Sequence, residues 1–110
     1  KILMQPLSNI RDVPCLGIFG HSVTQSMKTS YGFPAGVYVT SSKQDSPAFV
    51  SGIQSGDIIT GINGQSIETM EEYQQLLYSY SPGDVIMVNA MRQGRDGYIE
   101  IEFQCTVGVE

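Results

Sequence analysis

His21, the single histidine of the chain, is the first candidate for a catalytic residue. It lies in the string Gly20-His21-Ser22-Val23-Thr24, which begins like the Gly-x-Ser-x-Gly pattern of a nucleophile elbow. Thr24 stands where the sharp turn of an elbow requires a second glycine. The glycine signature around a trypsin-like nucleophile is also absent, and no motif supports Ser–Lys catalysis. We therefore interpret His21 as a solvent-exposed residue and predict that the chain is not an enzyme.

Metal and cofactor sites are not predicted either. A zinc site needs three or four ligands at short spacings, and this chain has one histidine and two distant cysteines, Cys15 and Cys105. There is no glycine-rich phosphate loop of the Walker or dinucleotide type.

The two cysteines leave a choice between a disulfide and free thiols. Cys105 keeps the alternating phase of Ile99, Ile101 and Phe103, which we expect on the buried face of a strand. A buried free thiol behaves as a small hydrophobic group. This phase favours free thiols, while one Cys15–Cys105 disulfide stays open.

Charge and composition exclude several classes of partner. The 110 residues carry a net charge of −5, and the six basic residues are scattered along the chain: Lys1, Arg11, Lys28, Lys43, Arg92 and Arg95. Nucleic acids and anionic membrane surfaces need clustered positive charge, so neither is a predicted partner. No apolar run is long enough to span a membrane. With 41% apolar and 15% charged residues, the composition indicates one globular domain.

The elements that position these side chains can be read from turns and caps. Strands are predicted at 16–19, 37–40, 57–62, 65–67, 85–92 and 98–107, with an Asn63-Gly64 hairpin turn. Ser46, Pro47 and Gly52 define a short helix over 47–51. Thr69 and Glu72 form a capping box that begins a longer helix over 69–80. Residues 22–30 are compatible with one more weakly amphipathic helix. The sum predicts an α+β fold: a partly open antiparallel β-barrel of five to six strands, capped by one long and one short helix.

The order of four sequence pieces resembles one known family. They are Leu16-Gly17-Ile18, Asp45-Ser46-Pro47-Ala48, the run SGIQSGDII over 51–59 and the run INGQSI over 62–67. Together they resemble the PDZ domain of bacterial HtrA/Deg-type serine proteases, in its permuted form. The resemblance divides the chain into an irregular arm (1–12), a PDZ domain (13–107) and a short tail (108–110).

The resemblance implies a binding site for the carboxyl terminus of a peptide. The amides of Leu16, Gly17 and Ile18 would hold the terminal carboxylate, and Ile18, Phe19 and Gly20 would pair with the peptide as an added strand. The second wall would come from the long helix, through Met70, Gln74 and Leu77. Met70 stands where many PDZ domains place a histidine, so an apolar C-terminus is the expected ligand. Several of these apolar residues have a second reading as core, and spacing cannot decide between the two: Leu16, Ile18, Met70 and Leu77.

Two functions follow from the resemblance. The chain either recruits C-termini of substrate or unfolded proteins to an attached serine protease, or regulates it; alternatively it is a PDZ scaffold, or the PDZ domain of another protease class. A chain that begins at Lys1 is expected to belong to a longer protein. The resemblance implies a location outside the cytoplasm.

Overall fold

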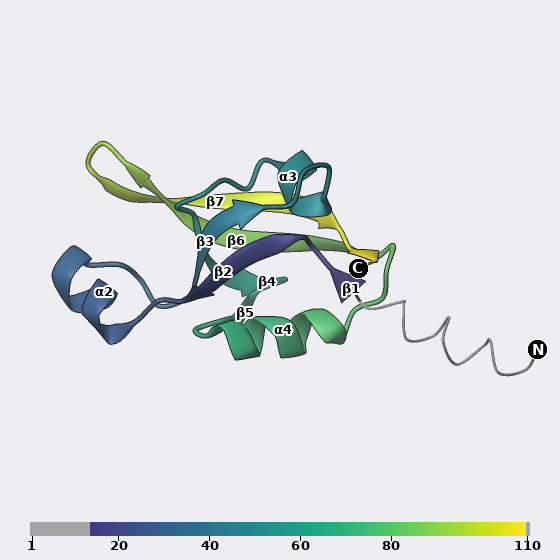
Figure 1. Ribbon diagram of the computed structural model, residues 1–110, viewed down its shortest axis with the longest axis horizontal. Helices are drawn as coiled ribbons and strands as arrows, with labels where there is room; N and C mark the ends of the chain where they lie inside the picture. The colour runs from purple at the N-terminus through teal and green to yellow at the C-terminus, as the bar shows by residue number, and fades with distance from the viewer. Residues whose placement is uncertain (1–13, 110) are drawn as a thin grey trace, which may run out of the picture.

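The computed structural model describes residues 14–109, so the expected arm (1–12) and Glu110 lie outside the described residues. The main sheet follows the order β2-β3-β4-β6-β7, with β5 paired to β4, and every pairing is antiparallel. Its strands are β2 (Ile18–Ser22), β3 (Val37–Ser42), β4 (Ile58–Ile62), β5 (Gln65–Ser66), β6 (Val85–Gly94) and β7 (Gly97–Thr106). The sheet bends round on itself but does not close, which confirms the predicted α+β, partly open architecture (Figure 1).

A separate two-stranded sheet joins the two ends of the described chain. In it β1 (Pro14–Cys15) pairs with β8 (Gly108–Val109). Residues 108 and 109, which the sequence suggested as tail, are therefore paired in the structure. The pairing anchors the chain just before residues 16–18.

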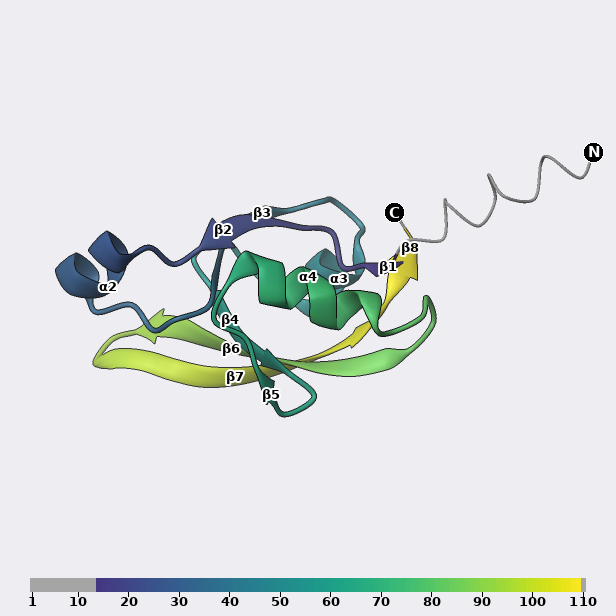
Figure 2. The same cartoon turned by 90° about the horizontal axis from the view of Figure 1, so that it is seen from below.

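The long helix lies across the open side of the bent sheet. It is α4 (Met70–Tyr78), and Figure 2 shows it between the β2–β3 arm and the β6–β7 arm. Thr69 Oγ1 accepts a hydrogen bond from the Glu72 amide at 3.1 Å, as the capping box predicts. In a capping box the Glu72 side chain would accept a hydrogen bond from the Thr69 amide. Here Glu72 Oε1 instead accepts from the amide of the preceding residue, Glu68, at 2.7 Å. The short helix α3 (Pro47–Ser51) has the predicted bounds, with Ser46 as its cap.

A third helix departs from the predicted pair. Residues 25–31 form α2 (Gln25–Tyr31), capped by Thr24 and ended by Gly32 with φ of 70°. None of its residues is buried, which explains why its apolar period is weak in the sequence. Beyond the helix, Phe33 stacks on Tyr38 with ring centroids 5.8 Å apart and meets Tyr98 edge-on. These ring contacts, rather than an apolar helix face, hold the 25–33 segment to the sheet.

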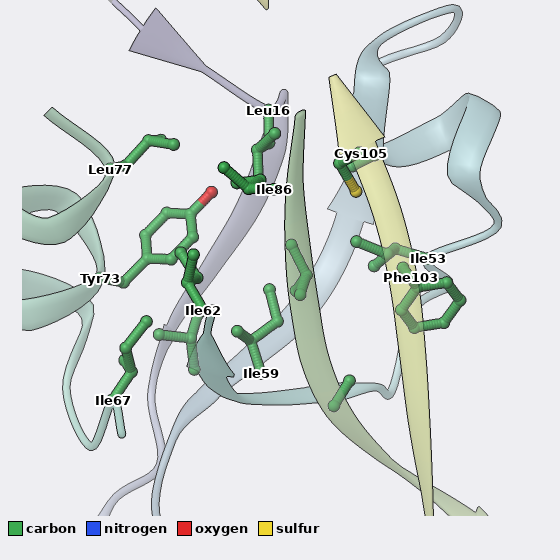
Figure 3. Close-up of a cluster of buried hydrophobic side chains, with 14 of the residues drawn as sticks. Leu16, Ile53, Ile59, Ile62, Ile67, Tyr73, Leu77, Ile86, Phe103 and Cys105 are labelled. Atoms are coloured by element: carbon green, nitrogen blue, oxygen red, sulfur yellow. The ribbon is translucent and has the colours of Figure 1, made fainter. Parts of the chain in front are cut away.

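The core fills the space between the bent sheet and α4. Figure 3 shows side chains from both converging there, among them Ile59, Ile62, Tyr73, Leu77 and Ile86. Burial of this apolar surface is the main force that holds the helix against the sheet.

An ion pair between the buried Asp57 and the partly exposed Arg92 fixes the segment that follows α3. The Asp57 carboxylate accepts two hydrogen bonds from the Arg92 guanidinium, both at 2.8 Å, and a third from the Gln54 amide at 2.9 Å. These bonds tie the start of β4 to β6. Such a fully bonded pair compensates for the cost of burying a charge.

The predicted buried face of β7 is correct at one end only. Phe103 and Cys105 are buried, and Cys105 is a free thiol, as its strand phase indicated. Ile99, expected in the same row, is 53% exposed. The β6–β7 hairpin extends past Met91, the last β6 residue paired with β4, so no layer covers Ile99.

Candidate functional site

A groove of about 500 Å³ lies between β2, α4 and the segment 43–47. Seven of the eight predicted site residues line it: Leu16, Gly17, Ile18, Phe19, Met70, Gln74 and Leu77. The eighth, Gly20, follows in β2 but is not among the lining residues. The fold thus brings together a loop and a helix that are more than 50 residues apart in the sequence.

The backbone of residues 16–18 (here called the 16–18 loop) is held from behind. The Leu16 carbonyl accepts a hydrogen bond from the Ala48 amide at 2.9 Å, and the Gly17 carbonyl accepts one from the Lys43 amide at 2.7 Å. In a planar trans peptide the N–H points opposite to the C=O. The N–H groups of Gly17 and Ile18 therefore point away from the groups that hold the two carbonyls. Two successive amides are left for an acceptor in the groove.

Gly17 is required at its position for two reasons. Its φ of +83° is a left-handed conformation that side chains disfavour. A Cβ added there would also lie 2.3 Å from the Cβ of Ser46, which is itself buried and caps α3 by accepting from the Phe49 amide. Because of the positive φ and the contact with Ser46, a larger residue at this position disturbs the fold as well as the loop.

The strand that borders the groove is an edge of the main sheet. Within the described residues β2 pairs only with β3, so its other side presents unpaired backbone groups. The register shifts between Phe19 and Gly20, and the Thr40 hydroxyl donates to the Phe19 carbonyl at 2.9 Å. A Cβ at Gly20 would lie 2.2 Å from the Tyr38 carbonyl oxygen. Gly20 thus allows β3 to approach closely, a packing role that the sequence did not reveal.

The helix contributes both core and groove residues. Leu77 is 4% exposed and belongs to the core cluster while lining the groove, and Met70 is half-buried against the same cluster. Gln74 is exposed while lining the groove. On the opposite wall Leu16 is 1% exposed and Ile18 is half-buried. Leu16 and Leu77 therefore belong both to the core and to the lining of the groove.

Sequence reasoning missed several residues of the groove. Tyr73 lines it and is 3% exposed, and burial raises the pKa of its phenol above the usual range, with Cys105 and Cys15 as smaller causes. Tyr73 lies four positions before Leu77, so helical spacing puts both on one face of α4, but spacing does not distinguish a core residue from a groove residue. Tyr78, Lys43 and Val109 also line the groove. Tyr78 lies one helical turn after Gln74, a spacing that could have placed it beside the groove. Local patterns held no signal for Lys43 and Val109, which reach the groove from other segments.

The His21–Ser22 neighbours do not form a nucleophile and base. His21 is exposed, and its Nδ1 lies 2.9 Å from the carbonyl oxygen of Ser22. Successive side chains of a strand point to opposite faces, so the Ser22 hydroxyl lies on the other side of β2. That hydroxyl accepts a hydrogen bond from the Met70 amide. Among the described residues no group of His, Cys, Asp and Glu is arranged to hold a metal ion, and no helix is long and apolar enough to cross a membrane.

Comparison with known proteins agrees with this geometry. The profile of the PDZ domain family matches residues 14–103. The chain belongs to the PDZ family. Curated relatives of this PDZ domain include the serine protease Do-like HtrA of Lactobacillus helveticus, 26% identical over 102 residues, which are 93% of this chain and 24% of the relative. A probable periplasmic serine endoprotease, DegP-like, of Pseudomonas fluorescens is 30% identical over 97 residues, 87% of this chain and 20% of the relative.

Solved structures with the same fold include PDZ domains with peptide ligands. The HtrA3 PDZ domain bound to a phage-derived ligand (FGRWV) superposes with a TM-score of 0.73 at 26% identity, covering 88% of this chain and 86% of that one. The HtrA-type protease AlgW with a decapeptide has a TM-score of 0.78 at 23% identity, covering 98% of this chain and 33% of that one. The chain spans about a quarter or less of the length of the curated relatives.

Proposed function

We propose that this PDZ domain binds the apolar carboxyl termini of substrate or unfolded proteins. The peptide adds to the free edge of β2 as an antiparallel strand, and its terminal carboxylate accepts hydrogen bonds from the amides of Leu16, Gly17 and Ile18. Ile18, Phe19 and Gly20 supply the pairing edge. Leu16 and Ile18 close an apolar pocket for the last side chain, and Met70, Gln74 and Leu77 are the positions of α4 that face the peptide.

The observation that carries this proposal is the orientation of the 16–18 loop. Because Ala48 and Lys43 hold the carbonyls of Leu16 and Gly17, the next two N–H groups are turned to the other side. Successive amides of this kind form an anion-binding nest. The HtrA3 PDZ domain, which has the same fold, binds a ligand that ends in Val, in line with an apolar pocket.

We further propose that the parent protein is a trypsin-like serine protease, located outside the cytoplasm, and that this chain recruits substrates to it or regulates it without catalysing cleavage. The support is the names of the relatives, several of which are periplasmic endoproteases. A PDZ scaffold, or the PDZ domain of another protease class, is the competing interpretation. Reading the coding region upstream of Lys1 separates them, because only the first requires a domain with a His, Asp and Gly-x-Ser-Gly-Gly triad.

The binding proposal is tested by calorimetry with matched peptides. We expect FGRWV with a free carboxylate to bind in the micromolar range, about −8 kcal/mol at 1 µM. Amidation removes the charge that strengthens the hydrogen bonds to the loop, so affinity should fall at least about tenfold, or about 1.4 kcal/mol. Replacing the last Val by Asp should also weaken binding, because the pocket is apolar. Equal affinities for acid and amide would contradict carboxylate capture and indicate that the groove reads internal segments.

A further inference from the structure

The main sheet has a second edge, far from the peptide groove. Within the described residues β2 and β7 are the two ends of the strand order, and β7 pairs only with β6. Figure 2 shows β7 on the side of the molecule opposite β2. One end of β7 is covered by α3, whose Ser51 hydroxyl donates to the Gln104 carbonyl at 3.2 Å. Residues 98–102 continue from there toward the hairpin turn, and none of them lines the groove.

The pairing with β6 decides which backbone groups of β7 point outward. Gly94 and Gly97 flank the two-residue turn of the β6–β7 hairpin, and the residues that flank such a turn exchange hydrogen bonds. Hydrogen-bonded and non-hydrogen-bonded positions then alternate along an antiparallel pair. The N–H and C=O groups of Tyr98, Glu100 and Glu102 therefore point away from β6. The carbonyl that α3 covers belongs to the next residue of the same series and points the same way.

The side chains along this open edge form two rows of different character. Glu100 and Glu102 are exposed on one face of β7, and Ile99 and Ile101 alternate with them on the other. Ile99 is 53% exposed. Glu102 accepts a hydrogen bond from the Asn89 side chain at 3.2 Å, but among the described residues no basic side chain forms an ion pair with either glutamate. The outward backbone groups thus lie between an acidic row and an apolar row.

A second copy of the chain does not fit this edge. In an antiparallel pair of two β7 strands centred on Glu100 or Ile101, Glu100 of one copy stands opposite Glu100 or Glu102 of the other. Like charges directly opposite each other destabilise a sheet, and each copy carries a net charge of −5. Charged side chains on an edge strand protect it from pairing with its own kind. A strand of opposite charge meets no such barrier.

We propose that the open edge of β7, residues 98–102, is a second docking site that binds an internal, extended segment of another protein in which basic and apolar residues alternate. The segment adds as an antiparallel strand and pairs with the outward backbone groups. Lys or Arg stands opposite Glu100 and Glu102, and apolar side chains lie beside Ile99 and Ile101. This site requires no terminal carboxylate. The domain can therefore hold a carboxyl terminus at β2 and an internal segment at β7.

Titration of the whole chain with acetyl-GKIKVTG-amide tests the charge match. The blocked ends remove carboxylate capture, and in the expected register the two lysines stand opposite Glu102 and Glu100. We expect a dissociation constant below about 1 mM. Glu100→Lys/Glu102→Lys should lower the affinity at least tenfold and should bind acetyl-GEIEVTG-amide instead. No binding of the lysine peptide by the unmodified domain overturns the inference.

A control variant separates the local charges from the net charge. Glu68→Lys/Glu71→Lys changes the net charge by the same amount at two exposed positions outside β7. Its affinity for acetyl-GKIKVTG-amide should stay within threefold of that of the unmodified domain. Equal losses in the two double variants would mean that the peptide responds to net charge alone, which overturns the inference.

Methylated backbone nitrogens show whether the segment pairs as a strand. The N–H groups of both peptide lysines should face β7, and that of the peptide isoleucine should point away. N-methylation of the lysines should lower affinity at least fivefold, and N-methylation of the isoleucine less than twofold. In hydrogen exchange, the amides of Glu100 and Glu102 should exchange fast in the free domain and become protected when the peptide binds. Equal effects of the two methylations, or unchanged exchange, would contradict strand addition.

Competition separates this site from the groove. The affinity for FGRWV should change less than twofold when acetyl-GKIKVTG-amide saturates the domain, and less than twofold in Glu100→Lys/Glu102→Lys. Displacement of one peptide by the other would place the lysine peptide at β2 and overturn the inference. A dimer of the unmodified domain in sedimentation, with the same β7 amides protected, would assign the edge to a second copy and also overturn it. Failure of FGRWV to bind contradicts the proposed function alone, because the β7 readouts do not depend on it.

Discussion

The two walls of the groove are built on different principles. The 16–18 loop presents backbone groups, and its shape depends on hydrogen bonds to the backbone of Lys43 and Ala48. The α4 wall presents side chains, some of which also hold the core together. Backbone amides look the same whatever the sequence, so the loop suits a feature common to all ligands, the terminal carboxylate. Side chains can change, so the helix is the wall on which ligand preference can vary.

The burial of individual residues sharpens this difference. Leu77 is 4% exposed, while Gln74, three positions earlier on the same helix, is exposed. One wall therefore combines a residue that the fold needs with a residue that it does not. On the loop no such freedom exists, because Gly17 is fixed by its φ and by Ser46.

The largest loss in the free energy of unfolding is expected from Gly17→Ala. The variant must adopt a left-handed φ, which costs about 1–2 kcal/mol, and its Cβ collides with Ser46, which adds about 1–3 kcal/mol. Gly64→Ala is the matched control, since Gly64 has φ of +84° with no atom within 4 Å of an added Cβ. Urea unfolding should show a clearly larger loss for Gly17→Ala. Equal losses would mean that Ser46 moves aside and that the loop is not rigid.

Leu77→Ala should affect both stability and binding. Removal of this buried side chain is expected to lower the free energy of unfolding by about 2–4 kcal/mol and to weaken peptide affinity, because the same side chain lines the groove. Leu76→Ala provides the comparison: Leu76 packs against the core but does not line the groove. It should destabilise the domain and leave the affinity of the folded fraction unchanged. A Leu77→Ala domain with normal affinity would assign Leu77 to the core alone.

Gln74→Ala should change ligand preference with little effect on stability. Its side chain is exposed, and exposed substitutions usually stay within about 0.5 kcal/mol. Met70→Ala should also reorder preferences, with a larger stability loss than Gln74→Ala because Met70 packs against the core. A panel of peptides that differ at the last three positions, together with thermal melts, measures both. If Gln74→Ala leaves the whole ranking unchanged, the helix wall does not select ligands at that position.

The smallest expected effect is a decline of stability at alkaline pH that originates under the helix wall. Burial raises the pKa of the Tyr73 phenol and of the Cys105 thiol above their ordinary values of 10.0 and 9.0. Between those values and the raised ones the unfolded chain releases protons that the folded chain keeps. The free energy of unfolding should therefore fall as the pH rises above about 9. Tyr73→Phe should flatten the decline measured by urea unfolding from pH 8 to 10.5; an unchanged slope would mean that Tyr73 does not contribute to it.

Most of the fold could be predicted from local sequence chemistry. Caps and turns are local chemistry, so Ser46, Gly52 and Thr69 predict where α3 and α4 begin or end. Strand alternation is equally local, and it placed Phe103 and Cys105 correctly on the buried face. It was wrong for Ile99, because a period of two says which residues share a face and not how far the covering layer extends.

The assembly of the site depends on contacts between distant segments that form when the chain folds. The bonds from Lys43 and Ala48 to the 16–18 loop join residues more than 25 positions apart, and no local pattern encodes them. The same holds for the Ser22–Met70 bond, whose partners are 48 positions apart. Periodicity also cannot say whether an inward-facing helix residue meets the core or a groove. That depends on how far the wall opposite the helix, formed by the 16–18 loop and β2, extends alongside it. The path of the whole chain determines this extent.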